Sequence, residues 1–168
     1  LTRITPPPNI AVDSCGLKWS NRVLRGNFSA KIDDKGRLKI PTAFRAHIEH
    51  KYGRSLFVTS LTGESVLLYP MRVWSRVERK LAKIPSTHPA RRRYSEQVNF
   101  FGQPAEFDKQ GRVLVHSRVR DAARMAGEVD VLGQLEYLEI WNHDVFLERR
   151  KRHPFTDDDA RALAEYDI

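Results

Sequence analysis

Apolar and polar residues alternate near residue 30 and predict a hairpin. Phe28, Ala30 and Ile32 are apolar at every second position, which is typical of a half-buried strand, and a short apolar run follows from Leu38 to Ile40. The four residues between the runs, Asp33 to Gly36, have the composition of a tight turn, because Asp accepts hydrogen bonds from nearby amides and Gly tolerates positive φ. We therefore expect two strands joined by this turn.

After residue 40 the apolar positions take a helical spacing. Phe44, Ile48 and Tyr52 fall on one face of a helix that we expect to begin with Thr42 as its N-cap and to end at Gly53. The same reasoning predicts a second hairpin over residues 56–59 and 66–69 and a longer helix over residues 71–84. This longer helix carries an apolar stripe of Trp74, Val77, Leu81 and Ile84.

The first hairpin recurs 75 residues later in the chain. Residues 32–41 match residues 107–116, with identical Asp, Gly and Arg and with apolar residues at the same positions. Further along, Arg45 matches Arg120, Tyr69 matches Trp141 and Trp74 matches Phe146. The chain is therefore predicted to hold two copies of one module.

The second copy predicts the same order of elements as the first. We expect strands over residues 103–107, 112–115, 129–132 and 137–141, a helix from Ser117 to Ala126 stopped by Gly127, and a helix over residues 143–152. Residues 88–101 predict a linking helix, and Thr156 is expected to cap a short helix in the acidic tail.

The fold class that follows is α+β, with short hairpins plus helices. An isolated hairpin is marginal in water, so we expect the two copies to pair in one pseudo-twofold unit. We divide the chain into a disordered leader (1–22), a first module (23–75), linking helices (76–101), a second module (102–146), and a C-terminal helix with an acidic tail (147–168). Four apolar residues either face other subunits in a homo-oligomer or complete the core of the monomer: Trp74, Val77, Leu81 and Phe146.

Composition limits the class of binding partner and the cellular environment that we expect. The 168 residues carry a formal net charge of +8, which suggests a polyanionic partner. No apolar run approaches the roughly 18 residues that a membrane span needs. The only cysteine, Cys15, lies in the leader, so a disulfide framework within the chain and a cysteine-cluster zinc site are excluded, and a reducing cytoplasmic setting is the natural interpretation.

Enzyme motifs are not evident. His47 and His50 lie three residues apart on a predicted helix, but no third metal ligand accompanies them, and we expect a surface pair. The sequence Gly63-Glu64-Ser65 lacks the second glycine of a nucleophile elbow. We predict a protein that is not an enzyme, with no cofactor, no metal and no small-molecule substrate.

Five motifs in a fixed order resemble the MraZ family of bacterial transcriptional regulators: Val23–Asn27, Asp33–Arg37, Leu67–Pro70 with Trp74, Asp108–Arg112, and Leu138–Trp141. The resemblance covers about residues 23–150 and implies two tandem SpoVT-AbrB-like swapped-hairpin modules with a β-barrel-like core. It also implies a ring-shaped homo-oligomer, cytoplasmic and associated with the nucleoid. Such a regulator binds double-stranded DNA at short G-rich direct repeats and represses its own operon in the division and cell-wall gene cluster.

The resemblance also implies which residues read the DNA. Arg37 and Arg112 match the arginines of the family's two Asp-x-x-x-Arg motifs. A two-stranded ribbon fits the major groove, where the fork of an arginine matches guanine O6 and N7. Lys35 is suited to a phosphate contact.

The remaining turn residues are expected to be structural. Asp33, Gly36, Asp108 and Gly111 shape the two turns, because a carboxylate repels phosphate and glycine adopts positive φ. In the second copy Gln110 replaces Lys35 and His116 replaces Pro41, so this module has the weaker claim to a phosphate contact. The basic run over residues 72–93 is expected to be the solvated face of amphipathic helices.

Two alternatives remain open from the sequence. One is an antitoxin-like protein-interaction module of the AbrB hairpin type, although the short tail after the second module disfavours it. The other concerns residues 1–22, which precede the point near Val23 where this family normally begins. Valine can be specified by an alternative start codon, so the leader is interpreted as a mis-called upstream extension.

Overall fold

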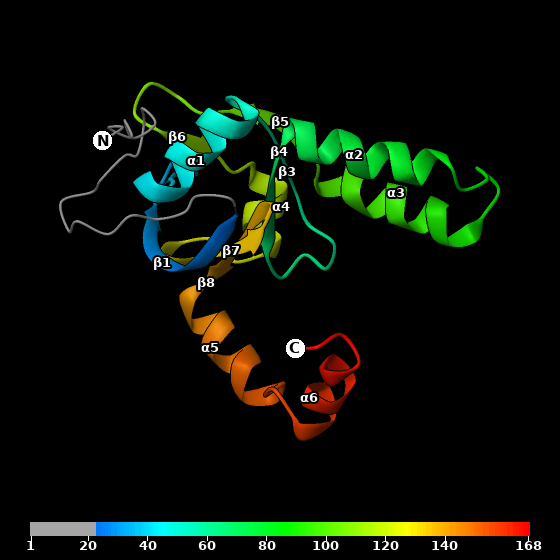
Figure 1. The fold of residues 1–168 in the computed structure, drawn as a ribbon. Helices are drawn as coiled ribbons and strands as arrows, with labels where there is room; N and C mark the ends of the chain where they lie inside the picture. Colours follow the sequence, from blue (N-terminus) through cyan, green and yellow to red (C-terminus); the bar gives the residue numbers. More distant parts are fainter. Residues whose placement is uncertain (1–22) are drawn as a thin grey trace, which may run out of the picture.

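The computed structural model describes residues 23–168, and predictions about the leader and Cys15 lie outside these residues. Strands and helices follow in two similar series (Figure 1). The first contains β1 (Leu24–Ile32), β2 (Arg37–Lys39), α1 (Thr42–Tyr52), β3 (Ser55–Thr59), β4 (Val66–Pro70) and α2 (Met71–Ala82). After α3 (Pro89–Phe101), the second contains β5 (Gln103–Glu106), β6 (Arg112–Leu114), α4 (Ser117–Ala122), β7 (Gly127–Leu135), β8 (Tyr137–Asn142) and α5 (His143–Arg152), and α6 (Asp157–Ala164) ends the chain.

The strands form an antiparallel, nearly closed barrel-like sheet in the order β5-β3-β4-β8-β7-β1-β2-β6. The modules exchange strands: β1 of the first pairs along its whole length with β7 of the second, and β3 pairs with β5. Short hairpins thereby obtain the additional partners that a stable sheet requires. The predicted α+β fold class with a β-barrel-like core is confirmed.

The register of two strand pairs, β2–β6 and β4–β8, shows a pseudo-twofold axis. In the β2–β6 pair Leu38 faces Val113, and these two residues are equivalent positions of the repeat. In the β4–β8 pair Leu67 faces Glu139, again two equivalent positions. A residue that faces its own repeat equivalent marks the axis, so the two copies are related by rotation within one chain.

One apolar cluster fills the barrel from both modules. Alternate residues of β2 and β6 point inward, and Leu38 and Val113 are fully buried. From α1, Phe44 and Ile48 join this cluster, and from α4, Val119 does. The face predicted for the first helix is therefore the face that it buries.

Helix boundaries differ from the expectation in both modules. Thr42 and Ser117 are the first helical residues rather than the caps; Pro41 and His116 occupy the N-cap positions, without a side-chain capping bond. Helix α4 ends at Ala122, before Ala126, because Arg124 takes a left-handed backbone (φ 52°) that terminates the helix. The capped helix after Thr156 is confirmed, with a reciprocal capping box.

Helices α2 and α3 lie side by side and project from one side of the barrel, whereas α5 and α6 extend from another (Figure 1). Trp74 of α2 is buried and stacks on Phe57 with ring centroids 4.4 Å apart, and Val98 of α3 completes this second cluster. Val77 packs against it. Trp74 and Val77 were expected either to face other subunits or to complete the core of the monomer. The structure supports the second alternative for both residues. No helix within residues 23–168 is long and apolar enough to cross a membrane.

Candidate nucleic-acid interface

The turn between β1 and β2 is organised by one carboxylate. Asp33 Oδ1 accepts hydrogen bonds from the backbone amides of Lys35 (3.0 Å) and Arg37 (2.9 Å). The backbone closes the turn independently, since the Gly36 amide donates to the Asp33 carbonyl (2.8 Å) and the Asp33 amide donates to the Arg37 carbonyl (3.0 Å). Gly36 takes φ 77°, the left-handed conformation that favours glycine.

The same carboxylate orients the arginine that follows the turn. Arg37 Nε donates to Asp33 Oδ2 at 2.7 Å. These bonds, from the Arg37 amide first and then from its guanidinium, lower the pKa of Asp33. Because the bond uses Nε, it does not occupy the two Nη groups of the guanidinium, which can still donate to another acceptor. Asp33 therefore both shapes the turn and orients the arginine.

The turn between β5 and β6 repeats this geometry. Asp108 Oδ1 accepts the amides of Gln110 (2.8 Å) and Arg112 (2.9 Å), and Arg112 Nε donates to Asp108 Oδ2 at 2.7 Å. The Arg112 amide and guanidinium lower the pKa of Asp108 to about 2. Gly111 takes φ 73°. Both predicted Asp-x-x-x-Arg motifs thus form the same local structure.

The β2–β6 pair brings the two arginines to one face. Leu38 and Val113 point into the barrel, so the residues on either side of them point outward. Arg37 lies opposite Leu114, and Lys39 lies opposite Arg112. We call these four side chains the β2–β6 outer face. Its arginine side chains are 36% and 25% exposed, for Arg37 and Arg112 respectively.

Lysines accompany both turns. Lys35 is exposed in the first turn, as expected, and Lys109 is exposed in the second, one position earlier in the motif. The replacement of Lys35 by Gln110 therefore does not leave the second turn without a lysine. The sequence pattern did not indicate Lys39 and Lys109, because each aligns with a non-basic residue of the other copy and is therefore not part of the repeated motif.

Each turn also touches a helix of the other module. A Cβ on Gly36 would overlap the guanidinium of Arg120 in α4, and a Cβ on Gly111 would overlap that of Arg45 in α1. The sequence repeat aligns Arg45 with Arg120 but gives no sign that they reach across the axis. Only the fold brings these arginines to the turns.

The two histidines of α1 do not form the expected surface pair. His47 is buried, whereas His50 is exposed, so the expectation of a surface pair was wrong for His47. On a helix that packs on the barrel, position 47 lies beside the inward-facing Phe44 and Ile48. Among residues 23–168 no group of three or more potential ligands is arranged for a metal.

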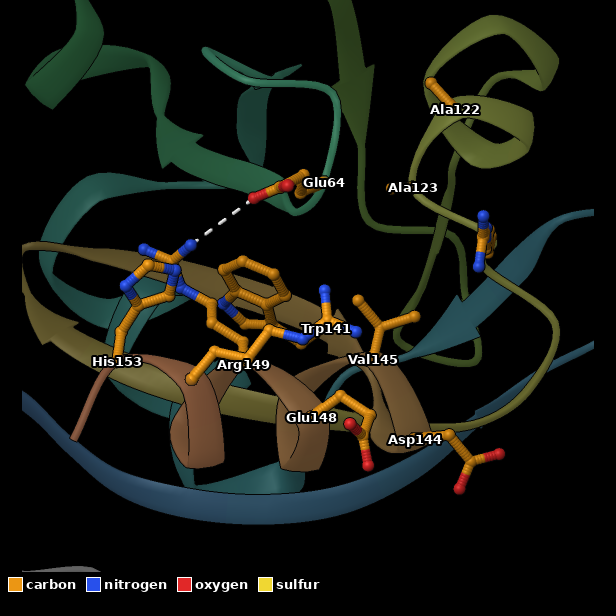
Figure 2. Close-up of a pocket in the computed structure, with 11 residues that line it drawn as sticks. Glu64, Ala122, Ala123, Trp141, Asp144, Val145, Glu148, Arg149 and His153 are labelled. Atoms are coloured by element: carbon orange, nitrogen blue, oxygen red, sulfur yellow. Dashed lines mark hydrogen bonds and ion pairs between the residues drawn. The ribbon is translucent and has the colours of Figure 1, made fainter.

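A cavity of about 430 Å³ lies away from the turns, between α5, the end of α4 and the β3–β4 loop. Arg149 spans it, with its guanidinium over the Trp141 ring (5.1 Å) and bonded to Glu64 (3.3 Å), as Figure 2 shows. None of the predicted site residues lines this cavity. The basic groups of the two turns instead lie on an open surface, which suits a polymer better than a small ligand.

Comparison with known proteins gives a consistent assignment. A family model described as "MraZ protein, putative antitoxin-like" matches residues 23–97 and 103–165. The protein named "Transcriptional regulator MraZ" of Acidobacterium capsulatum is 41% identical over 146 residues, which are 87% of this chain and 100% of the relative. Proteins of the same name in Koribacter versatilis and Syntrophobacter fumaroxidans are 42% identical (87% of this chain, 100% of the relative) and 35% identical (70% and 78%).

Proposed function

The chain belongs to the MraZ family, and from this premise we propose that it is a sequence-specific DNA-binding transcriptional regulator. The observation that carries the proposal is the pair of identical turns, each of which presents an arginine held by the carboxylate of its own motif. An arginine whose position is fixed before binding loses little conformational freedom when it meets a base.

The chemistry of the turns fits the major groove. A two-stranded ribbon enters this groove, and each guanine there presents O6 and N7 to the fork of an arginine. Arg37 and Arg112 supply two such forks on the β2–β6 outer face, and Lys39 lies directly opposite Arg112. Lys35 and Lys109 extend from the turns, where they would neutralise phosphates and fix the register without reading bases.

Repeated sites and an oligomer follow from the small size of this surface. Two arginines read very few base pairs, so one copy of the chain gives little specificity. A ring-shaped homo-oligomer presents the same turns to successive short G-rich repeats and gains affinity through effective concentration. We propose that this assembly represses its own operon in the division and cell-wall gene cluster, in the cytoplasm and on the nucleoid.

The second candidate function is a protein-interaction module. It is favoured by the term antitoxin-like in the family description. In this case a partner protein would bind the chain, and the turns would be structural.

The proposal is tested by DNA binding across a salt series. The probe is the DNA upstream of the protein's own gene, compared with a shuffled duplex, for wild type, Arg37→Ala and Arg112→Ala. Loss of a fork-to-guanine contact worth about 1–3 kcal/mol should weaken specific binding by roughly 5- to 150-fold. Affinity should also fall steeply as salt rises, because bound cations displace counterions from the phosphates.

Arg92→Ala is the matched control, since this exposed arginine of α3 pairs with Glu96 and lies outside the turns. If Arg37→Ala binds as well as Arg92→Ala, the proposed reader is wrong. If the wild type shows no preference for the upstream DNA and copurifies with one stoichiometric protein, the protein-interaction module is the better assignment.

A further inference from the structure

Both turns rest on the backbone of the opposite module. The Val115 amide, from the strand end after the second turn, donates to the Gly36 carbonyl at 2.8 Å. In the equivalent contact the Ile40 amide donates to the Gly111 carbonyl at 3.2 Å. The central glycine of each turn is therefore hydrogen-bonded to a residue that follows the other turn.

A guanidinium covers each of these glycines from the same opposite module. Arg120 lies against Gly36, and Arg45 lies against Gly111, so closely that a methyl group on either glycine would overlap the arginine. The side chains of Arg120 and Arg45 are 27% and 35% exposed. Such a contact needs both the absence of a Cβ and an arginine held in place by its helix.

Helices α1 and α4 hold the backbone of Arg45 and Arg120 in place. Arg45 Nε donates to Glu49 one turn later in α1, at 3.1 Å, and Arg120 lies 3.9 Å from Asp121 in α4. Both helices pack on the barrel through buried residues, Phe44 and Ile48 in α1 and Val119 in α4. A long side chain that starts from a packed helix, and in Arg45 is also hydrogen-bonded to Glu49, loses less entropy when it supports the turn.

We propose that Arg120 and Arg45 are positioning residues that act across the pseudo-twofold axis. Arg120 holds the turn that aims Arg37, and Arg45 holds the turn that aims Arg112. Each arginine that meets DNA is then fixed on one side by the aspartate of its own module and on the other by the helix of the opposite module. This inference rests on the proposed DNA-binding function and identifies which distant residues set the geometry of that site.

Double-mutant cycles in the full chain test the crossed pairing. Arg120→Ala should weaken specific DNA binding about tenfold, a size typical of coupled neighbours. This loss should vanish when Arg37 is already alanine, because the orientation of the turn then no longer positions a side chain that contacts a base. It should persist when Arg112 is alanine. Arg45→Ala should show the opposite pattern, coupled to Arg112 and additive with Arg37.

Two further variants separate positioning from simple charge. Arg118→Ala removes a cation from the same helix as Arg120, but its guanidinium bonds the Phe100 carbonyl and covers the Phe100 ring, so binding should not change. Arg120→Lys keeps the charge and loses the planar group, and it should not restore binding. If Arg120 contacted a phosphate instead, lysine would rescue binding, and Arg120→Ala would lower the salt slope by about one unit.

A measurement on the free protein distinguishes a local change in the turn from a loss of folding. In the free protein, the Nε–H resonance of Arg37, bonded to Asp33, should shift or broaden in Arg120→Ala and remain unchanged in Arg45→Ala. Additive cycles, rescue by lysine or an unchanged resonance would each overturn the crossed pairing while leaving DNA binding intact. Absence of specific binding by the wild type would instead count against the proposed function.

Discussion

The two modules agree in the barrel and differ in their outer helices. In the first module α2 buries Val73 and Trp74 and is accompanied by α3. In the second module the equivalent helix, α5, buries no residue, and every residue of α6 after it is exposed. The repeated sequence therefore forms similar strands in both modules, but only the outer helix of the first module packs into a second apolar cluster.

The cause of the difference is the segment between the modules. Helix α3 adds Val98 to the cluster of Phe57 and Trp74, and its Val98 carbonyl accepts a 2.6 Å hydrogen bond from the buried hydroxyl of Thr59. Among the residues that the structure describes, no equivalent helix covers α5, where Phe146 only tilts against Trp141 with ring centroids 5.6 Å apart. The added helix α3 thus accounts for the outer cluster of the first module.

Polar contacts replace apolar burial in the second module. Asn142 is the N-cap of helix α5, and its side chain accepts a hydrogen bond from the Val145 amide at 3.1 Å. The first residue of the helix, His143, bonds through Nδ1 to Asp130 Oδ2 at 2.8 Å, and the buried Asp130 also accepts from Asn27. The position equivalent to His143 in α2 is Met71, so this ionisable attachment belongs to α5 alone.

The largest expected effect comes from truncating the two equivalent aromatic residues. Trp74→Ala removes a buried ring and should cost about 3–5 kcal/mol of unfolding free energy. Phe146→Ala removes a half-buried ring and should cost about 1 kcal/mol. Urea unfolding of both variants measures the difference. Equal losses would contradict the comparison and would mean that another copy covers α5 in solution.

The turns should respond similarly in the two modules, with an intermediate effect. Gly36→Ala places a Cβ at positive φ against Arg120 and the Val115 carbonyl oxygen, Gly111→Ala places one against Arg45, and each should cost about 2–3 kcal/mol. Gly127→Ala is the control, because Gly127 has φ 69° with no atom near its Cβ position, so only the backbone cost of about 1–2 kcal/mol applies. Thermal unfolding compares the three. A cost at Gly36 no larger than that at Gly127 would show that Arg120 and the Val115 carbonyl both yield to the added methyl group.

The smallest effect is a pH dependence confined to the second module. The bond to Asp130 raises the pKa of His143 above its ordinary value of 6.5. The stabilisation is therefore complete below pH 6.5 and is lost as the pH rises through the higher pKa of the folded state. Hydrogen-exchange protection factors should fall over this range in α5 and stay level in α2. His143→Gln should abolish the change, and a parallel fall in α2 would refute its assignment to this bond.

The sequence predicted the turns better than any other part of the site. Asp33, Gly36 and Arg37 recur with the same spacing, and the bonds that define each turn join residues at most four positions apart, so the local pattern contains all the information. The helix starts were less accurate. Thr42 is an intrinsically good N-cap, yet Pro41, with an extended backbone (φ −50°, ψ 134°), occupies that position.

Contacts between the modules could not be read from the repeat. A duplicated hairpin is compatible with two separate units or with exchanged strands, and only the exchange brings Arg120 to Gly36. Burial of His47 has a similar origin, because a polar residue on a helix gives no local sign of the surface that will cover it. Arg45 and Arg120 were missed because each contacts a glycine of the opposite module.

The strand order also has a consequence for synthesis of the chain. Strand β1 is made early, but its long partner, β7, is complete only at Leu135, and Leu24 pairs with that residue. Contacts so distant in sequence slow folding, since the loop between them must close before the pairing stabilises anything. A ribosome that stops before Gly127 releases a chain in which β1 retains an unpaired edge, the kind of edge that promotes aggregation. Completion of the second module therefore protects the first during translation.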